Sequence, residues 1–291
     1  MSDAGKAWGW QLDHRAAPLP EAGAGPVRWT DVTGMTVRAR EDGDYRIEVP
    51  GIAVGEVRPR ARAIAIAPLD PGTSGETLDH LLVDQFLPRG LAHGGDLLVL
   101  HGGAVLIGGQ AVLFLGNTGM GKSTLTASFA RAGHGLLGDD AQAVRLDGGV
   151  AQVRAVAPGL RLLPDALAAL YPEPPPLVPL AHYSAKQRLG ALAMEAGWQR
   201  LSAIFVLGAA GEGEGIALRG MDPAASALAV LANSFALDPS DRARAAARLA
   251  LASRLAEAVP VHALAYPRRF DRLPEVRRAV MNLIGQDGDP A

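Results

Sequence analysis

The feature that most constrains the fold is the stretch GNTGMGKS, residues 116–123. It follows the apolar run AVLFLG and precedes STLTASFARA, a segment whose pattern predicts a helix. Three glycines let backbone N–H groups converge on an anion, and the N-terminus of the helix adds a positive dipole. The spacing G-x-x-x-x-G-K-S therefore predicts a strand, a phosphate-binding loop and a helix, which is the core of an α/β fold. We call residues 116–121 the glycine-rich loop.

The residue types in this motif predict a nucleotide triphosphate with Mg²⁺ as the ligand. Lys122 would reach the β and γ phosphates, and the Ser123 hydroxyl would ligate the metal. Of the 28 basic residues only Lys6, Lys122 and Lys186 are lysines, which favours a chemical role for a retained lysine. The alternative is a glycine-rich turn with an incidental lysine. The predicted nucleotide-binding residues are Gly116, Asn117, Thr118, Gly119, Met120, Gly121, Lys122, Ser123 and Thr124.

Two adjacent aspartates, Asp139 and Asp140, end the apolar run GLLG, seventeen residues after Lys122. A neighbouring parallel strand would bring its carboxyl end to the same crevice as the glycine-rich loop. One carboxylate would then hold Mg²⁺, and the other would accept a proton from an attacking hydroxyl. The alternative is a solvated Asp-Asp turn.

Four more polar residues are candidates for the same site. His101 follows the run LVL, at the predicted end of a strand, where it would orient a carboxylate or take part in proton transfer. Lys186 and Arg188, in HYSAKQRLG, would close over the phosphates or the acceptor, and Arg161, in GLRLLP, is a further candidate contact. The alternatives are a structural histidine and a solvated basic loop. The basic stretch 267–278 is interpreted as the polar face of a last helix.

The pattern along the chain predicts an arm and two domains. Residues 1–30, rich in Ala, Gly and Pro, predict a flexible arm, and 31–94 predict a small β-rich domain from the alternation in MTVRAR, YRIEV and ARAIAIA. Within it, 77–93 has helical spacing that Pro88 must break or kink. The α/β domain would span 95–291.

Inside the α/β domain, glycine pairs separate three apolar runs, which predict three short strands buried on both faces. QAVRL and AQVRAV flank DGG and predict a hairpin. The remaining predicted elements are a proline-rich loop (171–179), a buried strand at IFVLGA, and closing helices at 223–236, 239–258 and 273–284.

Composition excludes several classes of protein. The 28 basic and 30 acidic residues give a net charge of −2, which argues against a protein built to coat nucleic acid. The absence of cysteine excludes disulfides, thiolate zinc sites and cysteine nucleophiles. The N-terminus has no apolar core of a signal peptide, and the most apolar stretch is interrupted by glycines and His101, so we expect a cytoplasmic protein with no membrane span.

The block HGGAVLIGGQAVLFLGNTGMGKSTLTASFARAGHGLLGDDAQAV resembles the catalytic core of HPr kinase/phosphorylase and its relatives. That family carries a histidine before a hairpin, a phosphate loop, a helix, then Arg-x-Gly-His and paired aspartates. The match covers about residues 98–145, and looser similarity to HPr-kinase-related proteins extends over most of the chain. Two features depart from the family: Thr124 stands where glutamate is usual, and the chain carries no copy of the later Glu-x-Arg-Gly signature.

The resemblance implies a phosphoenolpyruvate-carboxykinase-like nucleotide fold and an ATP- and Mg²⁺-dependent kinase acting on a serine hydroxyl. It implies nucleotide binding by 116–124, metal binding by Ser123, general-base work by Asp139 with Asp140 in support or on the metal, and a catalytic-site role for His101. The acceptor stays open among an HPr-type protein, a precursor peptide and a small molecule. Phosphorolysis and a homo-oligomeric ring also stay open.

Two other functions remain as alternatives. A nucleotide-sensing regulator would bind ATP without transferring phosphate, and an ATPase would hydrolyse it. The chain lacks the LSGGQ segment of ABC ATPases and the Asn-Lys-x-Asp of guanine-specific proteins. Paired aspartates beside a phosphate loop favour transfer to a hydroxyl over sensing. A carboxykinase is a further alternative, although the chain is short for one.

Overall fold

The computed structural model describes residues 3–16, 19, 25–178, 180–190, 192–209 and 215–285. The chain is a mixed α/β protein that forms two compact units. Each unit combines one long stretch of chain with shorter segments that return to it. The first unit comprises Met1–Leu97, Pro179–Ser184 and Phe235–Ala247, and the second Leu98–Val178, Ala185–Ser234 and Arg248–Ala291.

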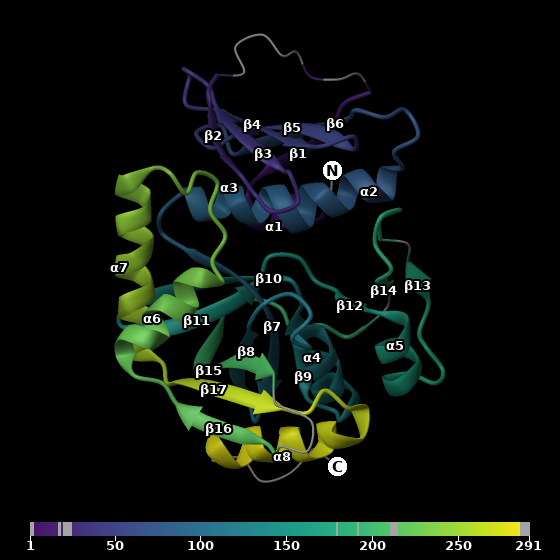
Figure 1. Cartoon of the computed structure of the whole chain (residues 1–291), viewed down its shortest axis with the longest axis vertical. Coiled ribbons are helices and arrows are strands. Elements are labelled where there is room, and N and C mark those ends of the chain that lie inside the picture. The colour runs from purple at the N-terminus through teal and green to yellow at the C-terminus, as the bar shows by residue number, and fades with distance from the viewer. Residues whose placement is uncertain are drawn as a thin grey trace. The chain divides into compact units, whose positions relative to one another are not determined.

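The first unit contains a six-stranded sheet in the order β1-β6-β5-β4-β3-β2 (Figure 1). All its pairs are antiparallel except β1 with β6. The alternating segments of the sequence form β3, β4 and β6, and Gly43, with φ +85°, makes the tight turn between β3 and β4. The strands are β1 (Gln11–His14), β2 (Val27–Thr30), β3 (Thr36–Ala39), β4 (Tyr45–Val49), β5 (Ala53–Arg58) and β6 (Ala63–Pro68).

The predicted helix at 77–93 forms with a wide turn in its middle. It consists of α2 (Gly75–Leu81), a π-helical turn η1 (Leu82–Phe86) and α3 (Leu87–His93). Ser74 caps α2 by accepting the N–H of Thr77, and Pro88 lies in the first turn of α3. Because the π turn precedes Pro88 directly, the ring and the missing N–H are accommodated without breaking the helix.

The expected flexible arm over residues 1–30 is wrong for much of its described part. Asp3–Trp8 form helix α1, and Trp10 and Leu12 are buried. β1 pairs with β6 and β2 pairs with β3. The short strands were missed because four residues are too few to show a period in a segment rich in Ala and Gly. Residues 1–2, 17–18 and 20–24 of the expected arm lie outside the described part of the chain.

The second unit is built on a sheet in the order β11-β10-β7-β8-β15-β17-β16, with β9 also paired to β7. β8, β15 and β17 run parallel, and the other pairs are antiparallel. The predicted hairpin around Gly148 and Gly149 is confirmed as β10–β11. The strands are β7 (Leu98–Ile107), β8 (Gln110–Leu115), β9 (Gly135–Gly138), β10 (Ala141–Asp147), β11 (Val150–Ala155), β15 (Gln199–Ala209), β16 (Ala217–Gly220) and β17 (Val261–Tyr266).

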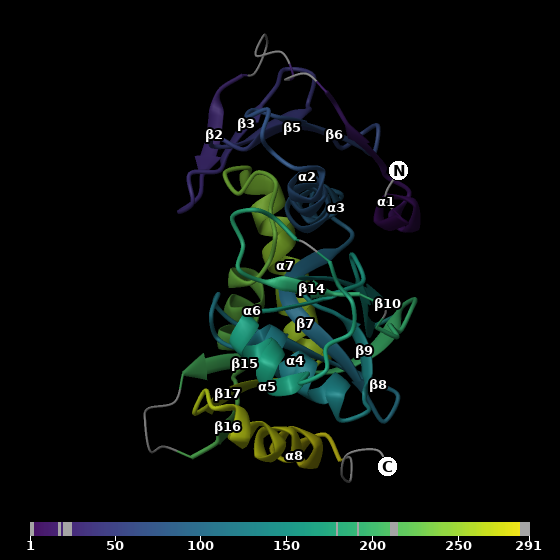
Figure 2. The same ribbon diagram turned by 90° about the vertical axis from the view of Figure 1, so that its right-hand side faces the viewer.

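Helices cover both faces of this sheet, which is why its strands are apolar on both sides. Along β8, Val112 and Phe114 belong to a core with helices α4 and α8, whereas Leu113 and Leu115 belong to a core with α6 and α7. Figure 2 shows α8 lying beside β16 and β17. The helices are α4 (Lys122–Arg131), α6 (Pro223–Ala232), α7 (Arg242–Ala258) and α8 (Leu273–Leu283), the last preceded by the 3₁₀ turn η2 (Phe270–Arg272).

The first two of the three expected short strands form one ten-residue strand, β7. The glycine pair at 102 and 103 does not break the strand, contrary to what the sequence pattern predicts, but allows close packing. A Cβ on Gly103 would lie 2.1 Å from Oγ1 of Thr126 in α4, and one on Gly102 would lie 2.6 Å from the Phe114 carbonyl. The glycines therefore let α4 and β8 approach the strand without turning the chain.

The remaining elements form a small third sheet, β12-β14-β13, and helix α5. Arg161 lies in β12 and Arg188 in β14, and these two strands pair antiparallel. Within the described residues, no helix combines the length and apolarity that a membrane span requires. The bounds are β12 (Leu160–Leu162), α5 (Pro164–Leu170), β13 (Leu177–Val178) and β14 (Gln187–Leu189).

Candidate functional site

The glycine-rich loop joins β8 to α4 at the carboxyl edge of the parallel strands β8, β15 and β17. Ligands of open α/β sheets bind outside this edge. β9 runs in the same direction as β8, because both pair antiparallel with β7. Asp139 and Asp140 follow β9 and so reach the same edge. The expectation that their strand neighbours the loop strand is wrong, since β7 lies between the two.

The loop is closed on itself by its own hydrogen bonds. Lys122 Nζ donates to the carbonyls of Gly116 (2.6 Å) and Asn117 (3.1 Å), and the Met120 N–H donates to the Asn117 carbonyl (3.2 Å). Gly119 and Gly121 have φ of +83° and +90°, a conformation that favours glycine. Lys122 is buried, and burial lowers the pKa of its ammonium. A bound phosphate would replace these carbonyls as the partner of Lys122.

Asn233, at the C-terminal end of α6, connects the loop to His101. Its Oδ1 accepts the N–H of Gly116 (3.0 Å), and its backbone carbonyl accepts the N–H of His101 (2.7 Å). Its Nδ2 donates to the Ala229 carbonyl (2.8 Å), which fixes the side chain. The sequence carries no signal for this role beyond an asparagine at a helix end.

Replacing Asn233 with alanine is expected to lower the free energy of unfolding by about 1–3 kcal/mol, because the buried N–H of Gly116 loses its acceptor. The measurement is urea denaturation of the full chain. Asn282→Ala, at an exposed position in α8, is the matched control and should change stability by less than about 0.5 kcal/mol. Equal stability of the two variants would contradict the anchoring role.

The paired aspartates lie in a tight and strained turn. Asp140 has φ +68°, and only Arg62 shares a positive φ among the non-glycine residues that the structure describes. The Ala141 N–H donates to the Asp139 carbonyl (3.0 Å), which makes a three-residue turn centred on Asp140. The Asp140 carbonyl in turn accepts the N–H of Gly102 (3.2 Å). Strain of this kind persists where surrounding contacts enforce it, commonly at functional sites.

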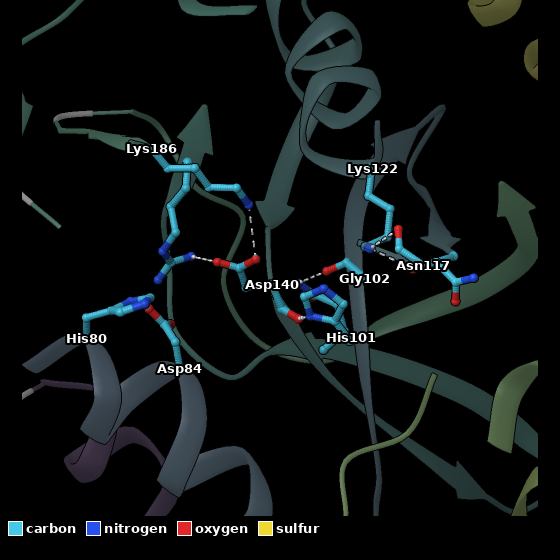
Figure 3. A network of polar contacts seen from close by, with 11 residues as sticks. His80, Asp84, His101, Gly102, Asn117, Lys122, Asp140 and Lys186 are labelled. Atoms are coloured by element: carbon cyan, nitrogen blue, oxygen red, sulfur yellow. Dashed lines mark hydrogen bonds and ion pairs between the residues drawn. The ribbon is translucent and has the colours of Figure 1, made fainter. Parts of the chain in front are cut away.

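Two cations meet the side chain of Asp140. Arg161 Nη1 lies 3.3 Å from Oδ2, and Lys186 Nζ lies 3.8 Å from Oδ1. Arg161 is only 1% exposed, whereas Lys186 is about one-third exposed at 34%. In Figure 3 Lys186 approaches the Asp140 carboxylate, while His101 lies on the side of the Asp140 carbonyl. Arg188 lies opposite Arg161 in the β12–β14 pairing.

The side chain of His101 is neutral and hydrogen-bonds to the turn formed by residues 139–141, which we call the aspartate turn. Its Nδ1 lies 2.9 Å from the Asp140 carbonyl, which can only accept, so Nδ1 carries the hydrogen and Nε2 the lone pair. Burial, and then the charge of Lys122, lowers the pKa of His101, so the ring is neutral at pH 7. His101 lies within β7, opposite Ala141, and not at a strand end as expected.

Asp139 has the properties of a base poised near neutral pH. It is 2% exposed, and burial raises its pKa to about 6, with the adjacent charge of Asp140 adding to the rise. Lys186, Arg161 and a hydrogen bond with Ser123 act in the opposite direction. Its buried Oδ2 has no hydrogen-bond partner among the residues that the structure describes. Such an oxygen is a natural acceptor for a substrate hydroxyl or a cation.

The oxygen donors near the loop fit Mg²⁺ bound together with phosphates. Among the described residues, no group of three or more His, Asp or Glu side chains gathers to hold a metal. Ser123, Asp139 and Asp140 supply hard oxygen ligands, and Asp139 Oδ2 has no partner within the described part of the chain. Mg²⁺ is usually held by one or two carboxylates plus substrate phosphates. The donor set therefore suits a metal that arrives with a nucleotide.

The structure brings most of the predicted site residues to one edge of one unit. A hydrogen bond, ion pairs and charge interactions connect six of these residues: His101, Lys122, Asp139, Asp140, Arg161 and Lys186. Asn117 and Thr118 are exposed in the loop, and Thr124 is half-buried in α4. Asn233, described above, and the segment after β17 were missed.

The similarity of this chain to a known structure is distant. No protein-family model matches the chain, and no curated protein matches it in sequence. Among solved structures, the HPr(Ser) kinase/phosphatase from Coxiella burnetii is similar at 12% identity with a TM-score of 0.35, over 64% of this chain and 93% of that chain. The family resemblance therefore stays a prediction.

Proposed function

We propose that this chain is a phosphotransferase that moves the γ-phosphoryl group of ATP to a hydroxyl group. The observation that carries the proposal is that three features lie at one edge of the sheet. They are the glycine-rich loop bonded to Lys122, the buried carboxylate of Asp139, and the two cations paired with Asp140. A binding loop alone would serve any nucleotide protein. A carboxylate with a pKa of about 6 beside that loop supplies the base that transfer to a hydroxyl requires.

The loop and the first turn of α4 would hold the polyphosphate. Backbone N–H groups of the loop and the N-terminus of α4 favour anions, and Lys122 adds a full charge. Since Lys122 Nζ now donates to two loop carbonyls, its bonds must exchange for phosphate oxygens on binding. Ser123, with Asp140, would hold Mg²⁺, which supplies charge neutralisation at the phosphates.

Asp139 would act on the acceptor. The hydroxyl proton passes to the carboxylate while the acceptor oxygen bonds to the γ-phosphorus, and the bond from that phosphorus to the β–γ bridging oxygen breaks to release ADP. Arg161 and Lys186 would stabilise charge on the transferred group, because Asp140 holds both at the edge. His101 would keep the strained turn in place through the Asp140 carbonyl.

We further propose a serine hydroxyl of a protein or peptide as the acceptor. This class rests on the resemblance of residues 98–145 to HPr kinases, and a precursor peptide fits it as well as a carrier protein does. The acceptor surface would lie outside the loop, on segments that vary most between enzymes of one fold.

The direct test is transfer of label from γ-labelled ATP by the purified full chain to a panel of serine peptides, carrier proteins and small hydroxyl compounds. We expect labelled phosphoserine that depends on Mg²⁺ and disappears in excess chelator. Mass spectrometry locates the phosphate. Tight ATP binding with no labelled acceptor would favour the nucleotide-sensing regulator, and release of inorganic phosphate alone would favour an ATPase.

A further inference from the structure

The segment after β17 reaches the same edge as the glycine-rich loop. β17 runs parallel to β15, and β15 runs parallel to β8, so the chain leaving β17 emerges beside the loop that leaves β8. Arg268 lies two residues beyond the end of β17 and before η2. It is therefore not part of the polar face of the last helix, as the sequence pattern suggested.

This segment contacts the loop at two points. Arg268 Nη1 donates to the Gly119 carbonyl at 2.6 Å. Tyr266 is 2% exposed, and its hydroxyl lies 3.2 Å from where a Cβ at position 121 would stand. Position 121 therefore favours glycine for two reasons: its φ is +90°, and a Cβ there would crowd the Tyr266 hydroxyl.

Arg268 differs from the arginines that follow it. Arg269 forms a two-point ion pair with Asp271, at 3.1 and 2.8 Å, and Arg272 pairs with Glu275 at 2.8 Å. Among the described residues, no carboxylate pairs with Arg268, whose bonded partner is the neutral Gly119 carbonyl. An exposed guanidinium in this position has further N–H donors for an anion. Phosphate oxygens are stronger acceptors for it than a carbonyl.

Resting on the proposed function, we propose that Arg268 is a further cationic contact for the polyphosphate of the nucleotide. Arg268 donates to the Gly119 carbonyl, as Lys122 donates to the carbonyls of Gly116 and Asn117. When a nucleotide binds, the side chains of Lys122 and Arg268 would exchange these carbonyls for phosphate oxygens. The nucleotide site is thereby made by three segments: the loop, the aspartate turn and the segment after β17.

The test is calorimetric binding of Mg·ATP and of inorganic tripolyphosphate to the full chain and four variants. Arg268→Ala is expected to weaken both ligands by roughly 10- to 100-fold, because it removes a charge-assisted hydrogen bond. Arg268→Lys keeps the charge and should recover most of the affinity. Arg268→Gln can still donate to the Gly119 carbonyl but has no charge, so it should bind as weakly as Arg268→Ala. Arg269→Ala, the neighbouring control, should bind as wild type does.

Three results would overturn the proposal while leaving the proposed function intact. Wild-type affinity in Arg268→Ala would exclude any contact. Full affinity in Arg268→Gln would show that the side chain only supports the loop. Loss for ATP without loss for tripolyphosphate would place the contact on the nucleoside. Failure of the wild-type protein to bind either ligand would instead overturn the proposed function together with this inference.

Discussion

Replacing Asp139 with asparagine is expected to slow phosphoryl transfer by roughly 100- to 10,000-fold, the range typical for loss of a general base. Asparagine keeps the shape of the side chain but cannot take the proton of the acceptor hydroxyl. Affinity for Mg·ATP should change little. In the wild type, transfer should fall as the pH drops below about 6, because the base is then protonated. Rates measured by phosphopeptide mass spectrometry, beside calorimetry for nucleotide, check both expectations.

The same substitution should stabilise the protein. The pKa of Asp139 is raised on folding from 3.8 to about 6, so the ionised carboxylate opposes folding at neutral pH. Below about pH 4 the group is protonated in both states and the penalty vanishes, and it is fully developed above pH 6. We therefore expect Asp139→Asn to gain roughly 1–3 kcal/mol in free energy of unfolding at pH 8 and almost nothing at pH 4.

Asp140→Asn provides the matched control on the neighbouring residue. It removes the carboxylate that pairs with the buried Arg161 and with Lys186, so it should destabilise the protein where Asp139→Asn stabilises it. Weakened Mg·ATP binding in this variant alone would assign the metal to Asp140. Unchanged transfer in Asp139→Asn would rule out the base and, with it, the kinase mechanism.

The sequence contained the local chemistry of the site but not the contacts that hold it together. The glycine-rich loop and the aspartates are contiguous motifs whose spacing has a direct physical meaning, so their place at a strand end could be predicted. Asn233 lies 117 residues from Gly116 and becomes visible as an anchor only when α6 packs on the sheet. The contact of Arg268 could not be predicted for the same reason. Its segment reaches the loop because β8, β15 and β17 lie in this order in one sheet.

Glycine and proline are the residues whose effect on the fold was hardest to predict from the sequence. Gly102 and Gly103 suggested a break, yet they lie in an extended strand where a side chain would collide with Phe114 and Thr126. Pro88 suggested a break or a kink, and a π turn accommodates it between α2 and α3. Glycine permits several backbone conformations, and a π turn can absorb the restriction that proline imposes, so in both cases the tertiary packing decides the outcome.

Replacing Lys122 with methionine is expected to reduce phosphoryl transfer by roughly 100- to 1,000-fold, the loss seen when a donor that stabilises transition-state charge is removed. Methionine has similar length and suits the buried position, but it carries no charge. Lys122→Arg should recover little, because a planar guanidinium does not fit where a compact ammonium donates to the Gly116 and Asn117 carbonyls. The measurement is ATP consumption and acceptor phosphorylation by the folded variants.

Lys6→Met is the control for the loss of one lysine. Lys6 is exposed in α1 and pairs across one turn with Asp3, at 3.7 Å, so its removal should leave transfer unchanged. Near-normal ATP consumption by folded Lys122→Met would show that the loop does not hold the reacting phosphates. The carbonyl bonds of Lys122 would then be structural, and the carboxylate of Asp139 would need another substrate to act on.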